Sequence, residues 1–142
     1  MKPIPMDKPL LVAGALLFLL GLLQGAATDL YLNPRMALSA HLTAVQSGMA
    51  MMLAGGIWSA VTLGPILSAA TRWSIMASMF ALWAALSLAA ATGASEALPI
   101  AGTGFAAGPF LDSIVSTMVL LSSAAMVVGW ALLLIGLLRA KA

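Results

Sequence analysis

The sequence has no cysteine and a single histidine among its 142 residues, and only 7% of the residues are charged. Without cysteine, the chain cannot form disulfides, thiolate zinc sites or iron–sulfur clusters, and it has no thiol nucleophile. One histidine and four acidic residues are too few for a self-contained transition-metal site. Soluble domains carry about 25% charged residues, so this chain cannot cover a surface that faces water.

The composition is instead that of an integral membrane protein. Hydrophobic residues make up 63% of the chain and the mean hydropathy is +1.11. The net charge of +2 comes from few groups, with no basic run and no alternation of basic and aromatic residues. Binding to nucleic acid is therefore not expected.

The charged residues are spaced so that they separate long uncharged stretches. A helix needs about 20 apolar residues to cross the hydrocarbon core. Gly64-Pro65 interrupts the longest stretch, which indicates a turn there. The sequence therefore predicts an all-α, four-helix transmembrane bundle that forms one integral membrane domain over residues 1–142. Its expected spans are 9–28, 34–61, 73–95 and 113–138.

Residues 96–112 are predicted to form a loop between the last two spans. This segment holds Pro99, Pro109 and three glycines, so it cannot satisfy its own backbone in lipid. It is also too apolar for a free loop, with Leu98, Ile100, Phe105 and Phe110. We expect residues 97–111 to pack as a lid over the outer end of the bundle.

Positive charges predict the orientation. With the N-terminus inside the cell, five of the six cations lie inside and only Arg35 lies outside, as the positive-inside rule requires. The opposite orientation reverses that ratio. The sequence therefore predicts a multi-pass protein with both termini inside. Trp58, Trp73 and Trp130 then lie near the inner boundary and Tyr31 near the outer one, where interfacial aromatics are common.

Small residues mark faces at which helices in lipid approach closely. Gly14, Gly21 and Gly25 lie on the first span, with the last two spaced as GxxxG. The pairs Gly48/Gly55 and Gly129/Gly136 are each seven residues apart, on one face of a helix. We interpret most of them as contacts within the bundle, with an oligomer interface as the alternative.

His41 is the residue that most needs an explanation. Asn33-Pro34 is typical of a helix start, with Asn33 as the N-cap and Pro34 in the first turn. His41 follows seven residues later, about 10 Å into the helix. Ionisable groups within a span tend to be functional and to face the bundle or a cavity.

The residues at helical spacing from His41 suggest a flat apolar ligand. Ala44, Gly48 and Met52 leave a low apolar surface on that face, which fits haem held by the imidazole. Arg35, near the outer boundary, fits the haem propionates. The alternatives are that His41 bonds to a carbonyl of another helix and that Arg35 lies at the headgroups.

The run from Asn33 to Leu42, NPRMALSAHL, resembles the start of the second span in the styrene oxide isomerase family of small bacterial membrane proteins. The continuation through Gly55-Gly56-Ile57-Trp58 is also similar. The resemblance implies a homotrimer in the bacterial inner membrane with haem b between subunits and His41 as axial ligand. It also implies that ferric haem acts as a Lewis acid and converts a small apolar epoxide to an aldehyde.

Other positions depart from the family pattern. The family has an asparagine six residues after the histidine, where this chain has Ser47 with Gln46 beside it. Ser47 or Gln46 would replace it as a catalytic residue, facing the site of a neighbouring subunit. The family also has a functional tyrosine on the third span, whereas Tyr31 is the only tyrosine here.

Three functional hypotheses remain open from the sequence. The first is a haem-dependent epoxide isomerase, in which the Trp83 ring could stabilise positive charge, although packing is the preferred interpretation of Trp83. The second is a haem protein without enzymatic activity, which carries electrons or senses a gas, with Met49 or Met52 of a neighbouring chain as second axial ligand. The third is a structural membrane protein.

Overall fold

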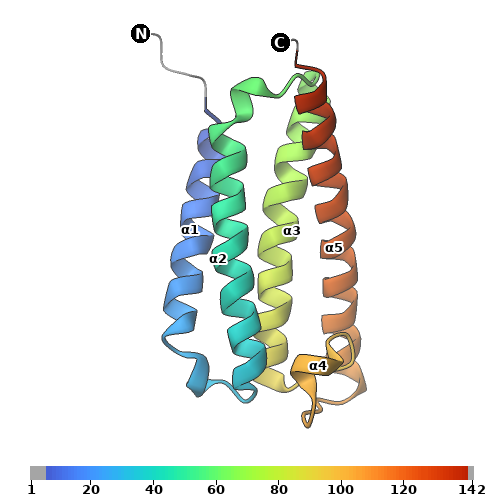
Figure 1. Cartoon of the computed structure of the whole chain (residues 1–142). Coiled ribbons are helices and arrows are strands. Elements are labelled where there is room, and N and C mark those ends of the chain that lie inside the picture. Colours follow the sequence, from blue (N-terminus) through green and yellow to red (C-terminus); the bar gives the residue numbers. More distant parts are fainter. Residues whose placement is uncertain (1–5, 141–142) are drawn as a thin grey trace.

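Four long helices lie side by side in a computed structural model that describes residues 6–140 (Figure 1). They are α1 (Lys8–Gly25), α2 (Pro34–Gly56), α3 (Pro65–Thr92) and α5 (Pro109–Leu138). Three short helical segments occupy the connections: η1 (Thr28–Leu30), η2 (Trp58–Ala60) and α4 (Pro99–Gly102). The described residues contain no strand, so the all-helical prediction is confirmed.

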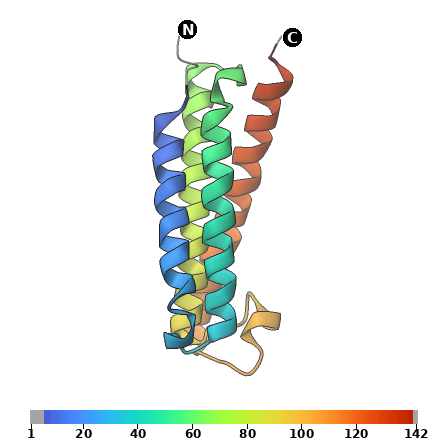
Figure 2. The same ribbon diagram turned by 60° about the vertical axis from the view of Figure 1, so that its left-hand side comes forward.

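Figures 1 and 2 show the two ends of this arrangement. The start of α1, η2 and the end of α5 lie at one end, which we name the terminal end. The connection containing η1 and the segment containing α4 lie at the other, which we name the loop end.

Polar caps fix the starts of α1 and α2. The Asp7 carboxylate accepts a hydrogen bond from the Leu10 N–H at 3.1 Å, and the Asn33 side-chain oxygen accepts one from the Met36 N–H at 3.1 Å. A proline follows in the first turn of each helix, where its missing N–H leaves no bond unmade. The helix start predicted at Asn33-Pro34 is confirmed.

Several helices begin or end at other residues than the predicted spans do. The break predicted at Gly64-Pro65 is present, but α3 begins there, at Pro65, rather than at residue 73, because Gly64 caps this helix and Pro65 is in its first turn. Arg72 therefore lies inside α3. The helix α5 likewise begins at Pro109 rather than at residue 113, α1 ends at Gly25, and α2 ends at Gly56.

Three of the long helices, α1, α3 and α5, are long and apolar enough to cross a membrane. The helix α2 is the least apolar of the four, since it carries Arg35, His41 and Gln46. It packs against both α1 and α3. The most polar long helix is thus covered on two sides by apolar ones.

Glycines bring the helices into close contact, as the sequence predicted. A Cβ at Gly14 would lie 2.6 Å from the Gly48 carbonyl oxygen, and a Cβ at Gly48 would lie 2.6 Å from the Phe18 nitrogen. Gly129 is packed in the same way against Ile75 of α3. These glycines permit contact between backbones, as in other membrane helix pairs.

An ion pair joins three segments at the terminal end. Arg72 Nε lies 2.7 Å from Asp7 Oδ2, and the Asp7 side chain is only 4% exposed. The Arg72 guanidinium also lies 5.6 Å from the centre of the Trp58 ring, within cation–π distance. The start of α1, η2 and α3 are therefore held together by one guanidinium.

The segment 96–112 contains α4, a single helical turn that the sequence did not predict. Leu98 and Phe105 are half-buried, but Ile100 and Phe110 are 88% and 76% exposed. We predicted that all four apolar side chains pack over the outer end of the bundle. This prediction was wrong for Ile100 and Phe110. The segment is instead joined to the start of α2 by polar contacts: the Asn33 amide donates to the Ala101 carbonyl at 2.9 Å, and Arg35 donates to the Thr103 carbonyl.

Candidate functional site

The His41 imidazole lies between α2 and α1 toward the loop end. Its Nδ1 is 2.7 Å from the carbonyl oxygen of Gly21, and the side chain is half-buried. A carbonyl oxygen can only accept, so Nδ1 must be the protonated nitrogen. In the neutral ring, Nε2 then carries a lone pair. Metal-binding histidines commonly donate their other nitrogen to a carbonyl, which fixes the tautomer and the ring orientation.

Gly25 makes room for this ring. A Cβ at position 25 would lie 2.6 Å from His41 Nδ1 and 2.7 Å from Cε1, far inside van der Waals contact. The two glycines therefore act together on the imidazole. The Gly21 carbonyl orients the ring, and the absence of a side chain at Gly25 leaves space for it. The GxxxG spacing on α1 serves to seat a histidine within the bundle.

One hypothesis for His41, a hydrogen bond to a carbonyl of another helix, is confirmed by this geometry. This hydrogen bond is compatible with a role of His41 as a ligand, because the bond uses Nδ1 and leaves the lone pair of Nε2 for another partner. The bond orients the imidazole between the two helices and leaves Nε2 as the nitrogen that could bind a ligand.

The apolar surface predicted beside His41 lies largely against α1. Ala44 is fully buried and would be touched by a Cβ at Gly21, while Gly48 packs against Gly14. Met52 also contacts Gly14, but it is half-buried and lines a small apolar cavity with Met49 and Leu53. Since α1 occupies the Ala44 and Gly48 surface, we retain only Met52 of these three as a candidate contact for a ligand.

Arg35 lies at the loop end and is engaged by the segment around α4. Besides its hydrogen bond to Thr103, its guanidinium lies 6.0 Å from the centre of the Phe105 ring. The structure therefore places this cation beside the loop, six residues before His41 on the same helix. A guanidinium has five N–H donors, so these contacts leave others available for an anionic group.

Ser47 and Gln46 do not share a face with His41. Helical spacing places each of them more than 100° around α2 from the imidazole. Ser47 is 8% exposed and buried in the bundle, whereas Gln46 is on the exposed surface. Among the described residues, no hydrogen bond joins either one to His41.

A polar cluster that the sequence reasoning missed lies at the same depth. It centres on Gln24, which is 5% exposed. The amide oxygen accepts from Trp83 Nε1 at 2.6 Å, and the amide nitrogen donates to Ser87 Oγ at 3.0 Å and to Tyr31 Oη at 3.3 Å. Gln24 directly precedes Gly25, which contacts His41, so the cluster and the imidazole flank the same turn of α1.

The sequence did contain a signal for this cluster, because Gln24 lies inside a predicted span. Burying an amide side chain in a membrane costs free energy unless the amide is hydrogen-bonded. Two earlier interpretations change as a result. Tyr31 is not only an interfacial aromatic, because its hydroxyl joins a buried amide. Trp83 is not only a packing residue, because its indole N–H is hydrogen-bonded.

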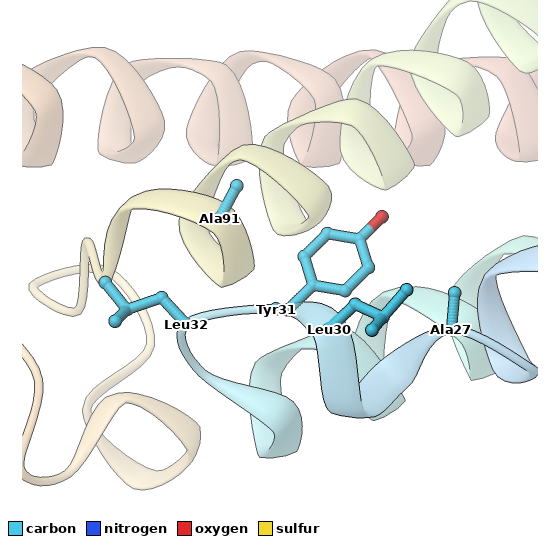
Figure 3. Close-up of a pocket in the computed structure, with 5 residues that line it drawn as sticks. All are labelled: Ala27, Leu30, Tyr31, Leu32 and Ala91. Atoms are coloured by element: carbon cyan, nitrogen blue, oxygen red, sulfur yellow. The ribbon is translucent and has the colours of Figure 1, made fainter.

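Tyr31 also lines a cavity of about 370 Å³ at the loop end. The other lining residues are apolar: Ala27, Leu30, Leu32 and Ala91. Figure 3 shows the Tyr31 ring between the η1 connection and α3, with its hydroxyl pointing away from Leu32. Leu30 and Leu32 are 87% and 58% exposed, so this is an open pocket on the surface rather than an enclosed cavity.

No group of three or more histidine or acidic side chains able to hold a bare metal ion occurs within residues 6–140. A porphyrin supplies four nitrogen ligands of its own, so it needs only one histidine from the protein. The ligand set of this chain therefore fits haem and does not fit a mononuclear metal site.

Comparison with known proteins agrees with the sequence resemblance. The family model for styrene oxide isomerase matches residues 6–138. Hydroxylaminobenzene mutase HabA of Ectopseudomonas oleovorans is 33% identical over 135 residues, which cover 94% of this chain and all of HabA. Hydroxylaminobenzene mutase HabB of the same organism is 34% identical over 139 residues, which cover 97% of this chain and 85% of HabB.

No solved structure matches the chain. The family match nevertheless extends through all four long helices, including α2 with His41. Together with three helices that are long and apolar enough to span a bilayer, it identifies a membrane protein. The chain belongs to the styrene oxide isomerase family.

Proposed function

We propose that the protein is a haem-dependent membrane isomerase that converts a small aryl epoxide to an aldehyde. Its family and its relatives, which are named as mutases, support an isomerase-type membrane enzyme. The observation that carries the haem part of the proposal is the bond between His41 Nδ1 and the Gly21 carbonyl.

His41 is the residue that would hold haem b, through Nε2. Arg35 would meet a propionate at the loop end. When bound, ferric haem supplies a Lewis acid for an oxygen atom of the substrate. The chain has no second histidine, so each subunit would hold the haem through a single imidazole, which suits a Lewis acid because it needs an open position.

The rearrangement suits a site poor in acids and bases. In the epoxide, the bond between oxygen and the carbon next to the aryl ring breaks, a hydride moves to that carbon from its neighbour, and the carbonyl forms. All atoms of the substrate remain in the product, so no external proton is needed. Leu38 and Leu42 flank His41 on α2, and this helix carries no carboxylate that could promote attack by water on the cation.

A second candidate substrate is hydroxylaminobenzene, because both relatives are named as mutases of that compound. Hydroxylaminobenzene and an aryl epoxide share one feature: an oxygen bonded to an atom that is attached to an aromatic ring. Either reaction is a rearrangement within one molecule. The same site could therefore serve both, and parallel assays distinguish them.

We further propose that all four long helices cross the bacterial inner membrane, with the terminal end in the cytoplasm. Lys8, Arg72 and Arg139 belong to the terminal end and Arg35 to the loop end, which supports this orientation. Lys2 and Lys141, which also contributed to the prediction, lie outside the described residues. The resemblance to the family supports a homotrimer with haem between subunits, which cross-linking in native membranes would test.

The decisive experiment is to purify the protein in detergent, record its spectrum and assay it in the ferric state. We expect a Soret band and formation of aldehyde from styrene-type epoxides, with hydroxylaminobenzene assayed in parallel. The His41→Ala variant should lose both the band and the activity, whereas Thr117→Ala, an exposed position on α5, should retain them.

Two results would contradict the proposal. One is a protein without stoichiometric haem. The other is a six-coordinate, low-spin haem with no product from either substrate before or after reduction with dithionite, which would favour an electron-transfer role.

A further inference from the structure

Four large apolar side chains are exposed on the connections at the loop end. Leu30 and Leu32 belong to the connection between α1 and α2, Ile100 lies in α4, and Phe110 lies in the first turn of α5. None of them belongs to the two apolar clusters of the bundle, whereas Leu98 packs against one of these clusters. In water these four side chains would keep apolar surface hydrated, so what surrounds the loop end needs an explanation.

Helix lengths give the depth of these connections. The Asp7 N–H donates to the Gly55 carbonyl at 3.0 Å, so α1 begins and α2 ends at one level. The exposed Lys8 and the Arg72 guanidinium mark this level as one boundary of the hydrocarbon, because charges are costly inside it. From there α1 extends over 18 residues, about 27 Å, and α2 covers about 32 Å between Gly55 and Pro34. The hydrocarbon core is about 30 Å thick, so both helices end close to its other boundary.

The connections at the loop end therefore lie at that second boundary. The segment η1 follows the end of α1 after two residues, and Leu32 directly precedes the cap of α2. The Asn33 amide ties α4 to the same level through the Ala101 carbonyl at 2.9 Å. The Ser95 N–H donates to the Asp112 carboxylate at 2.8 Å, which holds the start of α5 beside this segment. All four exposed apolar side chains thus belong to segments at the depth where headgroups meet acyl chains.

Exposed carboxylates accompany these apolar side chains. Asp29 precedes Leu30 directly, and Glu96 lies four residues before Ile100. Burying the two carboxylates against another protein would cost free energy, whereas at the headgroups they stay hydrated. Apolar side chains that alternate with charged ones are typical of segments that lie in the membrane interface.

Two open pockets in these segments also fit lipid. One is the pocket of about 370 Å³ beside Tyr31, and the other has about 250 Å³ and is lined by residues 97–101 of the segment around α4. Leu30 and Leu32 line the first pocket and Ile100 lines the second. An acyl chain is apolar and flexible, so it can follow the walls of such shallow pockets and remove them from water.

The position of the two connections favours lipid over a protein partner. Figures 1 and 2 show the η1 connection and α4 on different sides of the loop end. A partner protein seated on one side would leave the other side uncovered. Lipid surrounds the whole bundle, so it meets both segments at once.

We propose that the loop end is embedded in the bilayer interface, with Leu30, Leu32, Ile100 and Phe110 inserted among the first methylenes of the acyl chains. The backbone of residues 96–112, which is rich in glycine and proline, stays at the level of the headgroups, where water satisfies its polar groups. The inference rests on the proposed crossing of the membrane by four helices and is independent of the isomerase activity.

Site-directed spin labelling measures this depth, and the absence of cysteine allows one nitroxide to be attached at a time. In phosphatidylcholine vesicles, oxygen concentrates in the hydrocarbon, whereas a water-soluble nickel chelate stays outside it. The ratio of oxygen collisions to chelate collisions therefore reports depth. We expect this ratio to be severalfold higher for nitroxides on Leu30→Cys and Ile100→Cys than for nitroxides on Asp29→Cys and Glu96→Cys.

The controls separate depth from exposure. Asp29 and Leu30 are neighbours and both are exposed, so a difference between them reflects the medium that each one meets. Leu120→Cys, at an exposed position within α5, tests the membrane crossing and should give a high ratio. Thermal unfolding of each labelled variant checks that the fold is intact.

Two results at Leu30 and Ile100 would overturn the proposal. A ratio as low as that at Asp29 would mean that water surrounds these side chains. Few collisions with either reagent would mean that protein covers them, from a second copy or another partner. A preference for the chelate at Leu120 would instead remove the membrane crossing and this inference with it, whereas an inactive protein with the expected ratios would lose only the proposed activity.

Discussion

His41 Nδ1 and the Gly21 carbonyl oxygen lie 2.7 Å apart, across the interface between α2 and α1. This single bond fixes the tautomer of the only histidine and leaves the Nε2 lone pair as the candidate ligand. The Gly21 carbonyl oxygen and the absence of a side chain at Gly25 make it possible. The candidate metal ligand is therefore built by two helices, although only one of them carries it.

Gly25→Ala tests how closely the imidazole is seated. The added carbon would lie 2.6 Å from Nδ1, so the ring must move away from α1 and the bond to Gly21 must weaken. We expect haem content per protein to fall at least threefold, with the protein still in the membrane. The matched control is Gly56→Ala, where the added carbon meets nothing within 4 Å. Full haem content in Gly25→Ala would show that the close contact is unimportant.

Asp7 should be a major stabilising residue at the terminal end. It caps α1 and pairs with Arg72, so Asp7→Ala removes both interactions and leaves a guanidinium without its partner. We expect a loss of about 1–3 kcal/mol of stability, measured by thermal unfolding in detergent. Asp7→Asn retains a capping side chain and should lose less.

The control for Asp7 is Asp29→Ala, because Asp29 is exposed and forms no ion pair within the described residues. Equal Tm values for Asp7→Ala and Asp29→Ala would mean that the Asp7–Arg72 pair contributes nothing measurable.

The absence of cysteine allows a clean test of orientation. We expect an impermeant maleimide added to intact cells to label the Asp29→Cys variant and not the Arg139→Cys variant, because these exposed positions lie at opposite ends. Lysed cells should label both. Labelling of Arg139→Cys alone in intact cells would reverse the proposed orientation.

Arg35 should hold the segment around α4 against α2. Arg35→Ala removes the contacts to the Thr103 carbonyl and the Phe105 ring. We expect amide hydrogen exchange over residues 98–105 to accelerate severalfold, since opening no longer breaks these contacts. Ser39→Ala, which alters a half-buried hydroxyl one turn further along α2, is the control. Unchanged exchange in Arg35→Ala would show that Asn33 alone fixes the segment.

The sequence by itself determined the features that depend on local pattern. Few charges and long apolar stretches indicated a helical membrane protein, and Asn33-Pro34 marked a helix start because its capping chemistry acts within one turn. The motif around His41 indicated the family. The same reasoning predicted the break at Gly64-Pro65 but not that Pro65 begins the next helix, since glycine and proline can either end one helix or begin the next.

Only the tertiary structure decided which residues meet. The Gly21 carbonyl, the bare Cα of Gly25 and the imidazole of His41 come from two helices, and the pattern of either helix alone does not show their register. Gln24 and Trp83 are 59 residues apart and become partners only when α1 packs on α3. Ala44 and Gly48 offered an open apolar surface in the sequence, but α1 covers it. Helix propensity and hydropathy act along one chain segment, whereas such contacts depend on the rotation and depth of one helix against another, which close packing fixes.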